Sequence, residues 1–111
     1  MIKVDKTVNE KAVLRHGITT QSVVCIEEMA ELQKEISKFI RGKGNKDNLI
    51  EEMADVYICL NMLAKMYGVT DQQLNVEILR KQKRTLKRLG EIKYGYLETN
   101  SNNRPDQICK P

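Results

Sequence analysis

Four acidic residues fall where two apolar helices would otherwise place leucine. The 111-residue chain contains the runs QSVVCIEEMAELQKEISKFI and NLIEEMADVYICLNML. At about 100° per residue, a helix over the first run places Glu28 and Glu31 on its apolar arc. A helix over the second run places Glu52 and Asp55 on its apolar arc in the same way. The two helices therefore direct an ExxE and an ExxD pattern towards one interior.

These four carboxylates predict a cation site. A carboxylate in an apolar interior either protonates or binds a cation, because the burial of an unpaired charge is very unfavourable. Several carboxylate oxygens suit hard divalent ions, and Mg²⁺ is the first choice because it keeps part of its water shell and bridges to phosphates. The alternative is that all four lie at a boundary and pair with Lys or Arg. Two such motifs on adjacent apolar helices favour the metal site.

Two further polar residues lie on the same arc of the first acidic helix. Gln21 lies two turns before Glu28, so its amide is expected to point along the carboxylate face. It is either a hydrogen-bonding partner of a bound ligand or an ordinary polar residue of a first helical turn. Glu35 lies one turn beyond Glu31 and is a candidate to hold an outer ion or its water.

A short helix is expected to precede the first acidic helix. It covers Thr7 to about His16 and ends before Gly17. Its inner side is expected to be formed by Val8, Ala12, Val13 and Leu14. Thr19 or Thr20 offers a hydroxyl that can cap the following long helix, which runs to about residue 40.

The two acidic helices are expected to form an antiparallel hairpin. Residues 41–48, RGKGNKDN, concentrate Gly, Asn and Asp between two helical patterns and predict a loop. A loop this short joins antiparallel neighbours, which brings the two acidic motifs to the same level. Asn48 with Glu51 resembles a capping box at the start of the second helix, and Gly68 supplies a stop after Tyr67.

A basic face marks the final expected helix, Asp71 to about Leu89. Lys81, Arg84 and Arg88 are spaced at i, i+3 and i+7, so they share one face. Three interpretations stay open for this face. It is a solvated helix end with cations near the negative pole of the helix dipole, a set of phosphate contacts to a nucleotide, or a contact to a nucleic-acid backbone.

The composition predicts one soluble helical domain over residues 1–90, followed by a polar, weakly ordered tail over residues 91–111. Lys and Arg outnumber Asp and Glu by 19 to 15, and 41% of the residues are hydrophobic. Three cysteines without a CxxC motif indicate free thiols in a reducing compartment. No apolar run is long enough to span a membrane. We therefore expect a cytoplasmic protein with no membrane partner.

The acidic motifs resemble those of a known enzyme family. EEMAE, which contains Glu28 and Glu31, and EEMAD, which contains Glu52 and Asp55, are similar to the EExxE and ExxD signature of the MazG-like all-α nucleoside triphosphate pyrophosphatases. The similarity covers about residues 13–89 and includes SKFIRGK, IEEMADVYICL and KQKRTLKRL. A lone ExxE is unspecific, whereas two motifs in this order, spacing and helical context are specific.

The resemblance implies a fold, an activity and a set of site residues. The fold is an all-α, MazG-like bundle whose acidic helix pair is completed by oligomerisation to a homodimer or homotetramer. The activity is Mg²⁺-dependent hydrolysis of nucleoside triphosphates between the α and β phosphates, with Mn²⁺ as a substitute ion, in the house-cleaning of nucleotide pools. Glu28, Glu31, Glu52 and Asp55 are the metal ligands and catalytic residues, and Gln21, Lys81 and Arg84 bind the substrate.

The alternative belongs to another class of protein. A non-enzymatic, dimerising helical regulator could use its acidic stripe to meet a basic partner and its basic helix to bind nucleic acid. Three basic residues on one face are a small footprint for a polynucleotide, so nucleic acid is not the expected partner. Only the metal-binding interpretation predicts stabilisation by Mg²⁺ or Mn²⁺ in a thermal melt. The sequence contains no Ser/His/Asp or Cys/His set that favours covalent catalysis.

Overall fold

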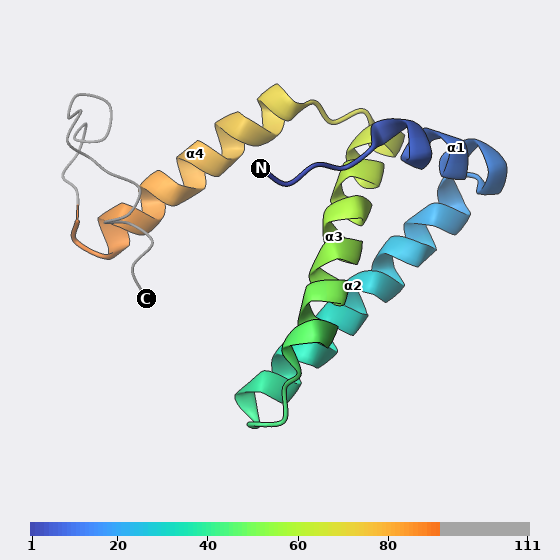
Figure 1. Ribbon diagram of the computed structural model, residues 1–111. Helices are drawn as coiled ribbons and strands as arrows, with labels where there is room; N and C mark the ends of the chain where they lie inside the picture. The colour runs from blue at the N-terminus through green and yellow to red at the C-terminus, as the bar shows by residue number, and fades with distance from the viewer. Residues whose placement is uncertain (92–111) are drawn as a thin grey trace. The chain divides into compact units, whose positions relative to one another are not determined.

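The described part of the chain, residues 1–91 of the computed structural model, is all-helical (Figure 1). Its four helices are α1 (Lys6–His16), α2 (Ile18–Ile40), α3 (Lys46–Tyr67) and α4 (Asp71–Arg88), which together make up 81% of these residues, with no strand among them. The prediction of an all-α protein is confirmed. None of the helices in this part of the chain has an apolar stretch of the length that a bilayer requires. Apart from Glu91, the expected tail lies outside the described residues.

The chain divides into two compact units between Thr70 and Asp71. The first unit contains α1, α2 and α3, and the described part of the second contains α4. The two units are described separately below. The single domain expected over residues 1–90 stays a prediction.

An antiparallel hairpin of α2 and α3 forms the body of the first unit (Figure 1). Its connection covers residues 41–45 and is shorter than the loop expected over 41–48, because α3 begins at Lys46. The side-chain oxygen of Asn45 accepts a hydrogen bond from the backbone N–H of Asn48 at 3.1 Å and so caps the helix. The cap predicted at Asn48 is wrong, since Asn48 is itself the donor inside the first turn.

A single residue joins α1 to α2. Gly17 has a φ of 89°, a conformation that favours glycine, and its N–H donates a hydrogen bond to the carbonyl of Val13 at 2.8 Å. The chain can therefore end one helix and start the next within one residue. Because α2 begins at Ile18 without a side-chain cap, the cap predicted at Thr19 or Thr20 is wrong, and both threonines lie in the first turn.

The other end of the hairpin is closed as expected. Gly68 has a left-handed φ of 70°, and its N–H donates to the carbonyl of Ala64, which ends α3 after Tyr67. The hydroxyl groups of Ser22 and Tyr67 are hydrogen-bonded at 2.6 Å. This bond ties the last turn of α3 to the start of α2.

The short helix α1 packs on α3 through a buried polar side chain. The amide of Asn9 donates hydrogen bonds to the carbonyl of Ile58 at 3.3 Å and to Oδ1 of Asn61 at 2.8 Å. Asn9 is buried, whereas Val8 and Leu14 are exposed. The predicted inner side of α1 is therefore wrong at Val8 and Leu14, because the face that meets α3 is centred on the Asn9 amide.

Two cysteines and a methionine form the core between the helices. Cys25, Cys59 and Met62 are buried, and partly buried side chains pack against them from α1 and α3. The Cys25 thiol donates to the carbonyl of Cys59 at 3.7 Å. Burial, followed by the hydrogen bond with Cys25, raises the pKa of the Cys59 thiol to about 12. The predicted free thiols are confirmed at Cys25 and Cys59, and Cys109 lies outside the described residues.

Candidate metal centre

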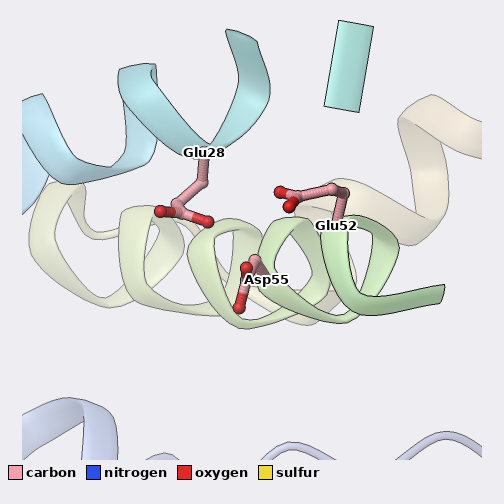
Figure 2. Close-up of side chains that lie close together, drawn as sticks. All are labelled: Glu28, Glu52 and Asp55. Carbon is pink, nitrogen blue, oxygen red and sulfur yellow. The ribbon is translucent and has the colours of Figure 1, made fainter. Parts of the chain in front are cut away.

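The hairpin brings three carboxylates together, one from α2 and two from α3. Oxygen atoms of Glu28, Glu52 and Asp55 all lie within 4.8 Å of one another. Figure 2 shows Glu28 projecting from α2 towards α3, where Glu52 and Asp55 lie one turn apart. All three side chains are partly buried. We call these three residues the carboxylate triad.

The fourth predicted ligand lies beside the triad. Glu31 is exposed, and its carboxylate is not among the oxygens that cluster. Its negative charge nevertheless contributes to raising the pKa of Glu28 and of Glu52. Glu31 is therefore close enough to act on the triad electrostatically without joining it.

A hydrogen bond and burial are the main causes of the raised pKa values in the triad, and repulsion between the carboxylates adds to them. A hydrogen bond to Asp55, then burial, then the charges of Asp55, Glu52 and Glu31 raise the pKa of Glu28 to about 7. The pKa of Glu52 is also raised, first by burial and then by the charges of Asp55, Glu31, Glu35 and Glu51. A proton or a cation would relieve this repulsion.

The surroundings of the triad fit a hard divalent cation. The ion pairs Lys38–Glu35, Lys65–Glu10 and Arg80–Glu77, which the structure shows within residues 1–91, do not include any of its three carboxylates. Oε2 of Glu52 is buried and has no hydrogen-bond partner. A donor set made of carboxylate oxygens suits hard cations such as Mg²⁺. The alternative that these carboxylates pair with Lys or Arg finds no such pair in the described residues.

Glu35 is the acidic residue of α2 that is most deeply buried. The residue is 6% exposed, and its Oε2 accepts a hydrogen bond from Nζ of Lys38 at 3.1 Å. Oε1 is buried without a hydrogen-bond partner. The sequence pattern points to Glu35 only as an outer residue, and its burial is the feature that the pattern does not reveal.

The predicted substrate ligand Gln21 is separated from the triad along α2. It lies in the first turn, two turns before Glu28, and is 7% exposed. In the part of the chain that the structure describes, no hydrogen bond joins its amide to the triad. Its role in substrate binding stays a prediction.

The other two predicted substrate ligands lie on α4, in the second unit. Lys81 and Arg84 are exposed and lie close to Glu77. The pKa of Glu77 is lowered, first by its hydrogen bond with Arg80 and then by the charges of Arg80, Lys81 and Arg84. The basic face thus also carries a carboxylate, which offsets part of its charge.

Comparison of the chain with protein-family models, with curated proteins and with solved structures finds no match. The resemblance to MazG-like enzymes therefore depends on the two acidic motifs and their setting.

Proposed function

We propose that this protein is a Mg²⁺-dependent nucleoside triphosphate pyrophosphohydrolase. It cleaves the triphosphate between the α and β phosphates and releases a nucleoside monophosphate and pyrophosphate. The observation that carries the proposal is the carboxylate triad, which two antiparallel helices hold together without a basic partner in the described residues. The type of reaction is inferred from the order and spacing of its motifs, which resemble the MazG-like signature.

The triad residues and Glu31 are the proposed metal ligands. Glu28, Glu52 and Asp55 would hold Mg²⁺, or Mn²⁺ in its place, and the exposed Glu31 would complete the set. A bound divalent ion neutralises phosphate charge and lowers the pKa of a coordinated water. The carboxylates hold the reacting groups at a partly buried position between α2 and α3.

Glu28 holds a proton that a bound cation would displace, because its pKa is raised to about 7 in the free protein. In the proposed reaction, water attacks phosphorus and loses its proton to solvent, and the bond to the pyrophosphate oxygen breaks. No covalent intermediate is proposed, because the buried Cys59 thiol has a pKa of about 12 and stays protonated.

The proposal extends to substrate binding and location. Lys81 and Arg84, one turn apart on α4, suit the charge of a triphosphate, and Gln21 suits a hydrogen bond to the nucleotide. The activity would serve nucleotide-pool house-cleaning in the cytoplasm.

We also propose that the active form is a homodimer or homotetramer. Large apolar side chains on the two acidic helices are exposed in the single chain, among them Ile26 at 67%, Ile50 at 54% and Leu60 at 52%. Exposed apolar surface on two long helices favours association with a second copy.

The test is pyrophosphate release from a panel of nucleoside triphosphates in the presence of Mg²⁺. Glu28→Gln and Asp55→Asn keep the side-chain shape and remove a charge, so we expect each to reduce turnover by about 100-fold or more while helical content is retained. Glu27→Gln is the matched control, because Glu27 is an exposed residue on the same helix. Near-normal turnover in Glu28→Gln and Asp55→Asn would reject the proposed ligands.

The second candidate function is a non-enzymatic module that binds a basic partner or nucleic acid. The exposed basic face of α4 is the observation that favours it. This candidate predicts no triphosphate hydrolysis and no thermal stabilisation by Mg²⁺, together with DNA or RNA binding that weakens with salt.

A further inference from the structure

Two of the buried core side chains are thiols from the two helices of the hairpin. Cys25 lies on α2 and is 1% exposed, and Cys59 lies on α3 and is 3% exposed. The sulfur of Cys25 lies 3.7 Å from the carbonyl oxygen of Cys59, to which its thiol donates a hydrogen bond. Both cysteines are free. The contact between α2 and α3 therefore contains a pair of reduced thiols.

The side chains of this pair also interact with each other. A hydrogen bond with Cys25 is, after burial, the next cause that raises the pKa of the Cys59 thiol. A disulfide requires two side chains that approach each other from neighbouring backbones, and its sulfur–sulfur bond is about 2 Å long. Interacting thiols on two packed helices meet the first condition, and a movement of the two sulfurs towards each other supplies the second.

We propose that Cys25 and Cys59 form a reversible disulfide that joins α2 to α3 when the protein meets a peroxide. This inference does not depend on the proposed hydrolase activity. Disulfides of proteins in reducing compartments are usually transient and respond to oxidants. The proposed bond is therefore compatible with the free thiols of the structure.

The reaction consumes one hydrogen peroxide for each disulfide. One thiol sulfur attacks the peroxide, so that a sulfur–oxygen bond forms, the oxygen–oxygen bond breaks and one water leaves. The product is a sulfenic acid. The second thiol sulfur then attacks this sulfenic acid, the sulfur–sulfur bond forms, the sulfur–oxygen bond breaks, and the thiol proton leaves in a second water. The two sulfurs together lose two electrons, which reduce the peroxide to water.

Opening of the hairpin admits the oxidant. Both thiols are buried, and the raised pKa of about 12 keeps the Cys59 thiol protonated and weakly nucleophilic in the closed hairpin. Local opening exposes such groups for a short time. The disulfide therefore forms in molecules that have opened, and it joins the two helices whose separation admitted the oxidant.

The disulfide would lie one helical turn from the carboxylate triad on each helix. Cys25 precedes Glu28 by three residues on α2, and Cys59 follows Asp55 by four residues on α3. A covalent bond at this position holds the two helices together beside the carboxylates that repel each other. Oxidised molecules should therefore open less often than reduced ones.

Oxidation of the full chain carrying Cys109→Ser tests the proposal, because this change leaves Cys25 and Cys59 as its cysteines. Hydrogen peroxide in native buffer should remove the mass of two hydrogen atoms per chain in intact mass spectrometry, and dithiothreitol should restore it. The oxidised protein should melt about 10 °C or more above the reduced protein, because the bond closes a loop of about 35 residues in the unfolded chain.

Cys25→Ala and Cys59→Ala in the same background are the matched controls. Neither should lose mass or gain thermal stability on treatment with peroxide. The decisive measurements need neither control, since they compare the oxidised and reduced forms of one protein. Addition of oxygen without loss of hydrogen, disulfide-linked pairs of chains on a non-reducing gel, or a disulfide that forms only in denaturant would overturn the proposal. An intrachain disulfide that leaves Tm unchanged or lowers it would do so as well.

Discussion

Glu28 and Asp55 share a hydrogen bond that only a proton can provide, because each is otherwise an acceptor. Glu28 therefore keeps its proton up to a pH of about 7 in the free protein. A divalent cation would take the place of this proton. The same oxygens would thus bind either a proton or an ion. In the metal-free protein, the protonation of Glu28 sets the charge of the triad.

This competition predicts how the stability of the metal-free protein depends on pH. The pKa of Glu28 is raised from 4.5 when unfolded to about 7 when folded, so the folded state binds more protons between these values. The stabilising effect is complete below the lower value and is lost as the pH rises through the upper one. In the presence of a chelator, we expect Tm to fall between about pH 5 and about pH 8, and to fall less in Glu28→Gln.

Thermal melts followed by circular dichroism measure this effect. The Glu28→Gln protein should melt at a higher temperature than the unmodified protein at the alkaline end, because Asp55, Glu52 and Glu31 no longer face a further charge. Parallel Tm profiles for the two proteins would contradict a raised pKa at Glu28.

Helix angles explain how much of the site the sequence could predict. At about 100° per residue, Glu35 lies roughly 20° from Glu28 around α2, whereas Glu31 lies roughly 60° away. The projection correctly placed Glu28, Glu52 and Asp55 on facing sides. It treated Glu31 as equivalent to Glu28, although the wider angle turns Glu31 to the edge, where it is exposed. It gave Glu35 only an outer role, although the smaller angle places this side chain on the buried face of α2.

At the scale of elements, the ends of the helices differ in how predictable they are. Gly17 and Gly68 have positive φ values, and few other residues accept this conformation, so each glycine marks an end clearly in the sequence. Starts are less distinct because Asn45, Asp47 and Asn48 can all serve as caps. The structure uses Asn45, three residues before the predicted cap.

The helix α4 permits a test that separates triphosphate binding from nucleic-acid binding. If Lys81 and Arg84 bind the triphosphate, replacing either by Ala should weaken turnover by roughly 1.5 to 3 kcal/mol, the range for a lost charge-assisted hydrogen bond. The fold should persist because both side chains are exposed. Steady-state kinetics of pyrophosphate release measure this loss.

Nucleic-acid binding by the basic face predicts a different experimental result. If the basic face binds nucleic acid, Arg84→Ala should leave hydrolysis unchanged. It should also reduce the slope of log K against log salt concentration for DNA or RNA binding by about one unit per lost contact. A filter-binding titration at several salt concentrations would detect it. Arg80→Ala is a useful comparison, because Arg80 is engaged by Glu77.

At the scale of the whole molecule, the first unit has little buried apolar surface for three helices. Cys25, Cys59 and Met62 are its buried apolar side chains. Small domains are stable only when they bury enough apolar surface, and association with a second copy is one way to increase it. The periodicity of the sequence predicted which helices are apolar, but it could not show which of their side chains the single chain leaves exposed.

This exposure predicts an assembly that a charge can disrupt. We expect the unmodified protein to sediment as a dimer or tetramer at micromolar concentration, and Ile26→Lys to shift it towards a smaller species. Ile26 is 67% exposed in the single chain, so the lysine should not disturb the folding of that chain. Leu14→Lys, at a position 86% exposed on α1, serves as the comparison. A monomer in analytical ultracentrifugation of the unmodified protein would contradict the proposed assembly.

If the carboxylate triad holds a divalent ion as proposed, its position between α2 and α3 also connects the supply of metal ions to the lifetime of the protein. Repulsion among Glu28, Glu52 and Asp55 acts directly across the contact that holds the hairpin together. A ligand that binds only the folded form lowers the fraction of molecules that open, and proteases cleave opened molecules. A cell depleted of divalent ions would therefore degrade this chain faster, and its abundance would follow the ion on which its proposed activity depends.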